Sequence, residues 1–302
     1  MQEVPKREGM SQEVRTSKFV VLLAVTALVL LQSALPLGCT QQTTSTLKVA
    51  ASTSLISSIV EQVGGDKVQV ANIIPPAQCP GHFDVDPADI KTLADANLFL
   101  MHGWQGETFN EQLIQSAHNP DLKVVSLNIM ENWMVPSVQA AATGNITSNL
   151  TQVDPQNASY YENNSKSQQA AIIAKGNELK TRLDTGNVSQ ANVICGDQIA
   201  GFVQWTGFNV VASYPRPEDL TPKKIQELVD IGRKEEVAVV IDNLQSGSPD
   251  AGVIMADEIG AVQVTLSNFP GGFDNTETWD KAAEKDVDLL LDALSQYRGR
   301  AH

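Results

Sequence analysis

Two kinds of hydrophobic pattern alternate along most of the chain. Short apolar runs such as Leu98-Phe-Leu-Met and Val237-Ala-Val-Val-Ile are typical of buried strands, and the stretches between them place apolar residues at helical spacing. This rhythm predicts an α/β fold of mostly parallel sheets flanked by helices. The expected strands are residues 47–52, 68–74, 98–101, 123–127, 191–195, 209–213, 237–242 and 262–266, and the expected helices are residues 54–63, 86–96, 109–117, 198–206, 221–234, 251–259 and 279–297.

The rhythm breaks once, near the middle of the chain. Residues 137–152 are small, polar and weakly periodic, which predicts a loop or an insertion. Residues 155–185 are polar with an interrupted apolar stripe, which predicts one helix of roughly 40 Å, long enough to span two domains. We therefore expect an N-terminal α/β lobe at 48–154, a bridging helix at 155–185 and a C-terminal α/β lobe at 190–299.

The chain opens with a basic, polar segment followed by an unbroken apolar run from Phe19 to Leu31. The run is short for a membrane span of about 20 residues, and it favours a signal peptide over the alternative, an uncleaved anchor helix. Gly38 before Cys39, with a polar tract after it, is similar to a bacterial-type lipoprotein cleavage site. We therefore expect a signal peptide at 1–38, a lipid on Cys39, a polar tether at 39–47, and a mature protein anchored to the outer face of the cytoplasmic membrane.

The chain is acidic, with a formal net charge of −14. Removing residues 1–38 takes away four basic and three acidic residues, so the mature charge becomes −15. Because such a surface repels nucleic acid and attracts cations, we expect no nucleic-acid partner. The sequence has no Gly-x-Ser-x-Gly elbow, phosphate-binding loop or His-Glu-x-x-His helix, so we expect no enzymatic activity.

Metal-ligand residue types follow several of the expected strands. Cys79 and His82 lie in the loop after the second strand, and His102 ends the third. Ligands of parallel sheets bind beyond the carboxyl ends of the strands, so these positions are at the right end of the sheet. The alternative is an ordinary Pro/Gly connection whose carboxylates cap the next helix. In the second half of the chain, the residues placed in the same way are Cys195, Asp197, Asp242 and Asn268.

Five Asn-x-Ser/Thr sequons cluster in the middle of the chain. They predict glycosylation of an exported protein, and the equal alternative is chance in a surface rich in Asn, Ser and Thr. The sites are Asn145, Asn149, Asn157, Asn163 and Asn187.

Three stretches resemble a known family. Lys48-Val-Ala-Ala-Ser-Thr-Ser-Leu, Ala94-Asp-Ala-Asn-Leu-Phe-Leu-Met-His-Gly and Asp154-Pro-Gln-Asn-Ala-Ser-Tyr-Tyr look like parts of the substrate-binding lipoproteins of zinc- and manganese-type metal ABC transporters. The resemblance runs from about residue 47 to residue 297. It implies a monomer of two lobes that captures a divalent metal ion in the cleft and delivers it to the permease of an ABC importer.

The resemblance also implies a metal site with one ligand from each of four loops. The first falls on His82, and the second on Glu131, because Glu131-Asn-Trp-Met-Val-Pro stands where the family has His-x-Trp-x-x-Pro. The third falls on Asp197 and the fourth on Asn268, so three of the four residues differ from the family's ligands. Oxygen donors of this kind can still hold a divalent cation.

Three further residues beside the expected site have alternative interpretations. Cys79 and Cys195 supply thiolates to a zinc-selecting site, form a disulfide, or stay free in the core. His102 is an additional ligand or a core histidine. We expect zinc as the first cargo and manganese as the second. The missing histidines leave open the same fold with a metal chelate or small organic ligand as cargo. The sequon cluster and the tether leave open a surface adhesion protein with a vestigial site.

Overall fold

The computed structural model describes residues 1–3, 46–103 and 109–300. The residues from Thr46 onward form one compact unit, which is described here by itself. The expected lipid attachment at Cys39, nearly all of the signal peptide and most of the tether lie outside the described residues. Within the described ranges, no helix combines the length and the apolar character needed to cross a membrane.

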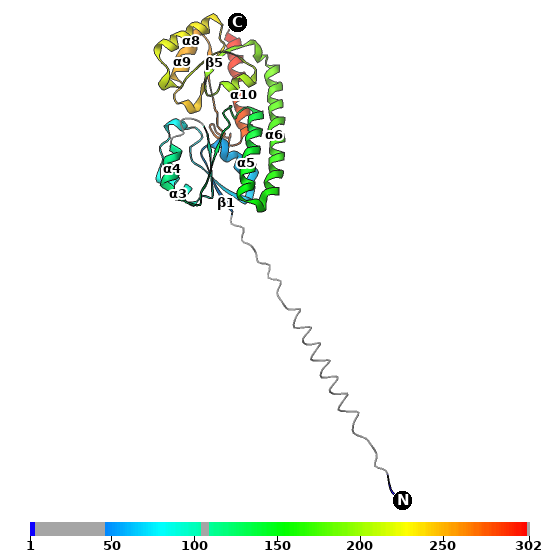
Figure 1. The fold of residues 1–302 in the computed structure, drawn as a ribbon. Helices are drawn as coiled ribbons and strands as arrows, with labels where there is room; N and C mark the ends of the chain where they lie inside the picture. The colour runs from blue at the N-terminus through cyan, green and yellow to red at the C-terminus, as the bar shows by residue number, and fades with distance from the viewer. Residues whose placement is uncertain (4–45, 104–108, 301–302) are drawn as a thin grey trace. The chain divides into compact units, whose positions relative to one another are not determined.

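The N-terminal lobe is built on a four-stranded parallel sheet (Figure 1). Its elements are β1 (Leu47–Ala51), α2 (Ser54–Gly64), β2 (Val68–Asn72), α3 (Pro87–Asp95), β3 (Leu98–His102), α4 (Phe109–Ala117), β4 (Lys123–Leu127) and α5 (Pro136–Val153). The strand order is β2-β1-β3-β4. Val49 and Leu100 pack in the cluster that holds α2 and α5, whereas Ala50 and Phe99 pack against α3 and α4. This alternation places helices on both faces of the sheet.

The C-terminal lobe repeats this plan on a second parallel sheet, with the order β6-β5-β7-β8. Its elements are β5 (Asn192–Gly196), α7 (Ala200–Thr206), β6 (Asn209–Tyr214), α8 (Pro222–Lys234), β7 (Val239–Asn243), α9 (Asp250–Ile259), β8 (Val262–Leu266) and α10 (Trp279–Arg300). Ile194 and Val240 pack against α8 and α9, whereas Val193 and Ile241 enter the cluster that contains α10. The two sheets confirm the α/β fold class and every predicted strand.

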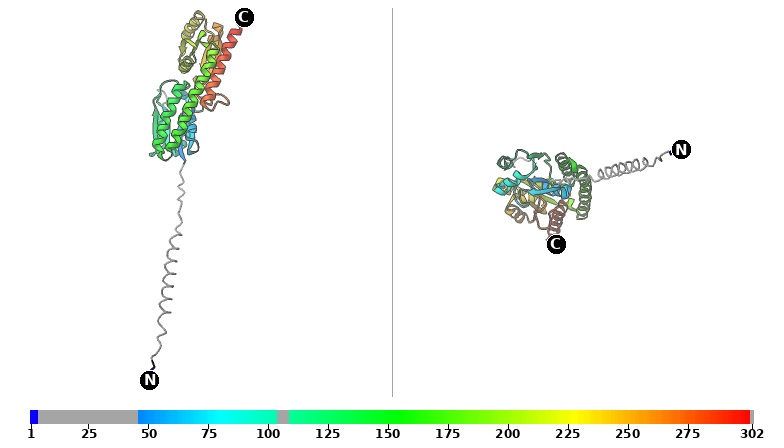
Figure 2. Two further views of the ribbon diagram at one scale, coloured as in Figure 1. Left: turned by 90° about the vertical axis from the view of Figure 1, so that its right-hand side faces the viewer. Right: turned by 90° about the horizontal axis from the view of Figure 1, so that it is seen from below.

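The long helix α6 (Ala158–Thr185) has 28 residues and joins the two lobes. At 1.5 Å per residue its length is about 42 Å. It packs against α2 and α5 of the first lobe and against α10 of the second, and Figure 2 shows α6 and α10 side by side. Lys175 and Arg182 on α6 form ion pairs with Glu284 on α10, with N···O distances of 3.3 and 3.5 Å. The bridging helix predicted from the sequence is therefore a single helix that contacts both lobes.

Residues 137–152 differ from the sequence prediction, because they form most of helix α5 and not a loop. The buried face of α5 includes Gln139, Thr143 and Ile146 at helical spacing. The Thr143 hydroxyl donates to the Gln139 carbonyl at 2.9 Å, and the Thr147 hydroxyl donates to the Thr143 carbonyl at 2.7 Å. These bonds satisfy the buried hydroxyls, so a stripe that is polar in the sequence is buried in the fold.

The five predicted glycosylation sites lie on α5, on α6 and in the turns at the ends of α6. Three of them donate local hydrogen bonds from their side chains: Asn157 Nδ2 to Asp154 Oδ2 at 2.7 Å, Asn149 Nδ2 to the Asn145 carbonyl at 2.9 Å, and Asn187 Nδ2 to the Thr185 carbonyl at 3.4 Å. Glycosylation stays a prediction.

Candidate functional site

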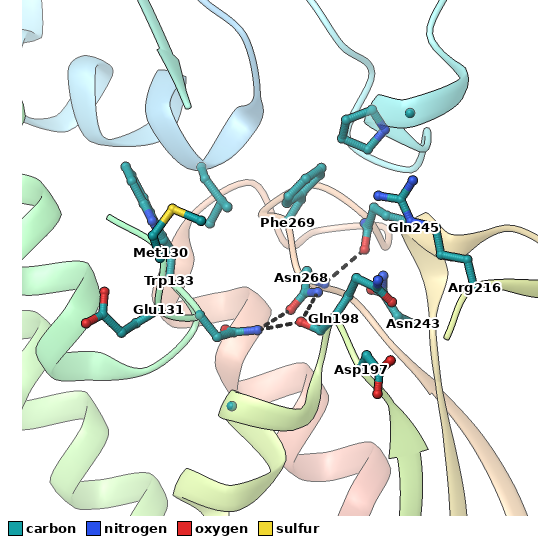
Figure 3. A pocket seen from close by; sticks show the side chains of 15 residues that line it. Met130, Glu131, Trp133, Asp197, Gln198, Arg216, Asn243, Gln245, Asn268 and Phe269 are labelled. Carbon is teal, nitrogen blue, oxygen red and sulfur yellow. Dashed lines mark hydrogen bonds between the residues drawn. The ribbon is translucent and has the colours of Figure 1, made fainter. Parts of the chain in front are cut away.

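A cavity of about 470 Å³ lies between loops of the two lobes (Figure 3). Residues 130–133 follow β4, residues 197–198 follow β5, and residues 268–269 follow β8. The short turn η3 (Pro80–His82) adds residues 80–81. The cavity is therefore built at the carboxyl ends of strands from both sheets, where ligands of parallel sheets bind.

Three of the four predicted ligand residues line this cavity. They are Glu131, Asp197 and Asn268, one from each of three loops. His82 is not among the lining residues, and its Nε2 lies 3.5 Å from Glu218 Oε1. Glu218 belongs to the turn η6 (Pro217–Asp219) of the C-terminal lobe. In this structure, His82 contacts the opposite lobe without lining the cavity.

The two carboxylates of the cavity, Glu131 and Asp197, belong to exposed residues. Figure 3 shows them on opposite sides of a central group of amide side chains that includes Gln198 and Asn268. Among residues 1–3, 46–103 and 109–300, no group of three or more His, Cys, Asp or Glu side chains is placed to hold a metal ion. The predicted ligands share one cavity, and the set itself stays a prediction.

Amide side chains connect the two lobes across the cavity. Asn132 Nδ2 donates to the Gln198 main-chain oxygen at 2.9 Å and to Asn268 Oδ1 at 2.8 Å. Asn268 Nδ2 donates to the same Gln198 oxygen at 2.9 Å. The Met134 N–H donates to Asn132 Oδ1 at 2.8 Å, which fixes the orientation of the amide. We call Asn132, Gln198 and Asn268 the amide bridge.

Two more amides support the bridge from the C-terminal lobe. Gln245 Oε1 accepts a hydrogen bond from the Asn268 N–H at 3.0 Å, and Gln245 Nε2 donates to the Pro76 carbonyl at 2.8 Å, which lies in the other lobe. Asn243 Nδ2 donates to Ser246 Oγ at 2.9 Å. Within the described part of the chain, the buried Asn243 Oδ1 has no hydrogen-bond partner.

Cys79 and Cys195 are both free in the structure, which contradicts the disulfide interpretation. Cys79 and Cys195 are both buried, and neither is among the lining residues of the cavity. Burial, with a smaller effect from the nearby Asp197 carboxylate, raises the pKa of the Cys195 thiol to about 12. Because the thiolate is the metal-binding form, Cys195 is a poor ligand near neutral pH, and its place is in the core.

His102 is a buried core histidine in the structure. Its Nε2 is 2.8 Å from Thr53 Oγ1, and its ring packs edge-on against Trp133 with 4.7 Å between the ring centroids. Burial lowers the pKa of His102 to about 3, so the imidazole is neutral at physiological pH. His102 therefore packs behind the cavity wall that Trp133 forms and does not line the cavity.

Two carboxylates of the Cys79 loop cap a helix, as the alternative interpretation of that loop expected. Asp86 Oδ1 accepts hydrogen bonds from the Ala88 and Asp89 N–H groups at 2.7 and 3.1 Å. Asp89 Oδ2 accepts a bond from the Asp86 N–H at 3.0 Å, which completes a capping box at the start of α3.

Sequence reasoning missed most of the amides and the one arginine of the cavity. It selected Asp242 at the end of β7, but Asp242 accepts hydrogen bonds from Tyr214 Oη at 2.6 Å and Gln263 Nε2 at 2.7 Å and does not line the cavity. The next residue, Asn243, lines it, because successive side chains of a strand point to opposite faces. Asn243 could have been found from the sequence, because it directly follows Asp242 at the end of the same strand. No feature of the sequence marks Arg216 in this way.

The chain matches the family model described as the zinc-uptake complex component A, periplasmic, over residues 49–293. A manganese ABC transporter substrate-binding lipoprotein, ScaA of Streptococcus gordonii, is 25% identical over 246 residues, which cover 73% of this chain and 79% of the relative. The manganese-binding lipoprotein MntA of Halalkalibacterium halodurans is 23% identical over 287 residues, which cover 86% of this chain and 94% of the relative.

Solved structures share the fold. The crystal structure of ZnuA superposes with a TM-score of 0.71 at 19% identity, covering 83% of this chain and 100% of that chain. A Mn-bound periplasmic metal binding protein from Candidatus Liberibacter asiaticus superposes with a TM-score of 0.69 at 19% identity, covering 82% of this chain and 99% of that chain. At this identity the likeness is one of fold.

Proposed function

This chain belongs to the family of the zinc-uptake complex component A, and from that premise we propose that it is the receptor that captures a divalent metal ion for an ABC importer. Members of this family are solute-binding components of transporters and are not enzymes. The observation that carries the proposal is the meeting of Glu131, Asp197 and Asn268 in one cavity between the lobes. Two carboxylates and an amide oxygen are donors that suit a divalent cation.

We propose manganese before zinc as the cargo. The zinc-selecting site expected from the sequence used the two thiols, and neither these thiols nor His82 line the cavity. The donors that do line it are oxygen atoms, and carboxylate and carbonyl oxygens suit Mn²⁺, whereas zinc favours nitrogen and sulfur ligands. His82 would have to leave Glu218 and turn inward to join the other three, so we assign it to the contact between the lobes.

We also propose that the protein is a monomer tethered by a lipid on Cys39 to the outer face of the cytoplasmic membrane, where it meets its permease. Both curated relatives described above are named as lipoproteins, and one is named as part of an ABC transporter. A short tether that starts at Cys39 and a folded unit that starts at Thr46 agree with this arrangement.

The test is metal binding by the purified full-length chain. Elemental mass spectrometry of protein purified without chelators is expected to find about one Mn²⁺ or Zn²⁺ per chain. Isothermal titration then compares the wild type with a variant that carries Glu131→Gln and Asp197→Asn. Because each substitution removes a charged oxygen donor from the cavity, we expect the affinity for Mn²⁺ to fall by at least tenfold.

The matched control carries Glu162→Gln and Asp257→Asn, which remove the same two charges from exposed positions on α6 and α9. We expect this control to bind like the wild type. Equal affinity of the cavity variant and the control would overturn the assignment of Glu131 and Asp197.

A further inference from the structure

The cavity is much larger than a site for one bare ion. Its volume is about 470 Å³, whereas one water molecule occupies roughly 30 Å³ of liquid. Pockets that bind small organic molecules have volumes of about 300–1,000 Å³. The cavity therefore has room for an organic molecule together with a metal ion.

The charges on the cavity wall have both signs. Arg216, from the segment after β6, lines the cavity and forms no ion pair with any carboxylate in the described ranges. A Cβ on Gly81 would lie 2.4 Å from Arg216 Nη1, so the guanidinium rests against the bare backbone of this glycine. An arginine stays charged in a protein and pairs with carboxylates, so it repels a bare cation and attracts an organic anion.

The negative charges lie elsewhere on the same wall. Figure 3 shows Glu131 and Arg216 on opposite sides of the amide bridge, with Asp197 below the bridge. Between them the wall consists of neutral amides, which donate and accept hydrogen bonds without adding charge. A ligand that complements this wall carries a positive centre at one end and a negative group at the other.

The rest of the wall is apolar. It includes Leu55, Met130, Trp133 and Phe269; Met130 is 65% exposed, whereas each of the other three is at most 3% exposed. Apolar and aromatic lining with a few placed polar groups is the usual composition of a site for a small organic molecule.

We infer that the cavity takes the metal as a complex with an organic carboxylate. In this complex the metal ion lies toward Glu131, a carboxylate of the chelator pairs with Arg216 on the opposite side of the amide bridge, and the carbon skeleton of the chelator lies between them beside the exposed Met130. This inference rests on the proposed function, because it names the chemical form of the same cargo.

The experiment is isothermal titration of the full-length chain with five probes: Mn²⁺, citrate, dipicolinate, and the 1:1 complexes of Mn²⁺ with each anion. Citrate offers several carboxylates on a flexible chain, and dipicolinate holds two carboxylates on a rigid ring. We expect at least one complex to bind ten times more tightly than Mn²⁺ alone. We expect Arg216→Gln to weaken that complex at least tenfold, Arg216→Lys to weaken it less, and neither to weaken binding of Mn²⁺ alone, because the arginine charge repels a bare cation.

Lys166→Gln, which removes a positive charge from an exposed position on α6, is the control and should bind all probes like the wild type. Equal affinity for Mn²⁺ and for both complexes, unchanged in Arg216→Gln, would overturn the inference and leave the metal receptor in place. Binding of an anion with no effect of added Mn²⁺ would overturn both. If none of the five probes shows detectable binding, the inference is also overturned. The metal content of the isolated protein then tests the proposed function separately.

Discussion

Asp286 on α10 is a fully buried carboxylic acid that supports a loop of the cavity. Its Oδ1 accepts a hydrogen bond from the Ser267 N–H at 3.0 Å, one residue before Asn268, while its buried Oδ2 has no partner within the part of the chain that the structure describes. Burial raises the pKa of Asp286 well above its usual value.

The raised pKa of Asp286 predicts how the stability depends on pH. Because the folded state holds this proton to a higher pH than the unfolded state does, Asp286 makes the free energy of unfolding fall as pH rises above about 4, at up to about 1.4 kcal/mol per pH unit. Asp286→Asn removes the titration and keeps an acceptor for Ser267, so the variant should lose this fall. Urea unfolding at pH 5, 6, 7 and 8 measures the difference, with exposed Asp257→Asn as control. Identical pH slopes for wild type and Asp286→Asn would contradict this account.

Sequence analysis found the two carboxylates and Asn268 of the cavity and missed most of its other neutral side chains. Asp197 and Asn268 could be found because each lies just after a strand, and parallel strands place such residues at one edge, whereas Glu131 was found only through the family resemblance. Asn132 and Gln198 are adjacent in sequence to two of these, but their importance depends on a contact between the lobes, in which Asn132 Nδ2 donates to the main-chain oxygen of Gln198. Such contacts are set by the packing of the lobes and leave no local pattern in the sequence.

At the scale of elements, α5 and α6 approach each other closely at one point. A Cβ on Gly176 of α6 would lie 2.6 Å from Cγ of Pro136, the first residue of α5. Real contacts of a Cβ are essentially never so short, so only glycine permits this approach. In contrast, a Cβ on Gly144 of α5 would meet only Gln169 Nε2, at 3.7 Å.

These two glycines predict opposite effects of the same substitution. Gly176→Ala should destabilise the protein by about 1–3 kcal/mol, because the overpacking against a rigid proline ring exceeds the gain in helix propensity. Gly144→Ala should stabilise it by about 0.5–1 kcal/mol, because only the propensity changes. Urea unfolding of both variants measures the free energies. A stabilising Gly176→Ala would show that the two helices can separate without cost.

The same close packing explains why α5 was the element that sequence reasoning missed. The strands and the other helices carry large apolar residues at periods near 2 and 3.6, so their pattern predicts them. The buried face of α5 instead includes Ala140, Thr143 and Thr147, which suit a close helix–helix contact but resemble a polar loop in the sequence. Predicting α5 from the sequence would have required knowing that α6 packs against it.

At the scale of the whole folded unit, the lobes share one hydrophobic core. A single cluster of buried residues contains Leu55 and Trp133 of the N-terminal lobe together with Phe202 and Trp279 of the C-terminal lobe. The Trp279 Nε1–H donates to the Met134 carbonyl at 3.2 Å, which ties α10 to the start of α5. Such a core makes it costly to unfold one lobe while the other stays folded.

We predict one cooperative thermal transition for both lobes. Leu93 packs only in the cluster under α3 and α4, and Leu228 only in the cluster under α8 and α9. Leu93→Ala and Leu228→Ala should each destabilise by about 2–5 kcal/mol and move the same single transition to lower temperature. Differential scanning calorimetry of the wild type and both variants provides the measurement. Two separable transitions, each shifted by only one of the variants, would show that the lobes unfold independently.

In the amide bridge, the Asn132 side chain competes with the cargo for the oxygen of Asn268. Any cargo that takes the oxygen of Asn268 for itself must first break the hydrogen bond from Asn132. The observed affinity is then the intrinsic affinity multiplied by the fraction of molecules in which the bridge is open. A receptor built in this way has a threshold: weak or poorly shaped ligands fail to open the bridge, and only a cargo that replaces the lost bonds remains bound long enough to be handed on.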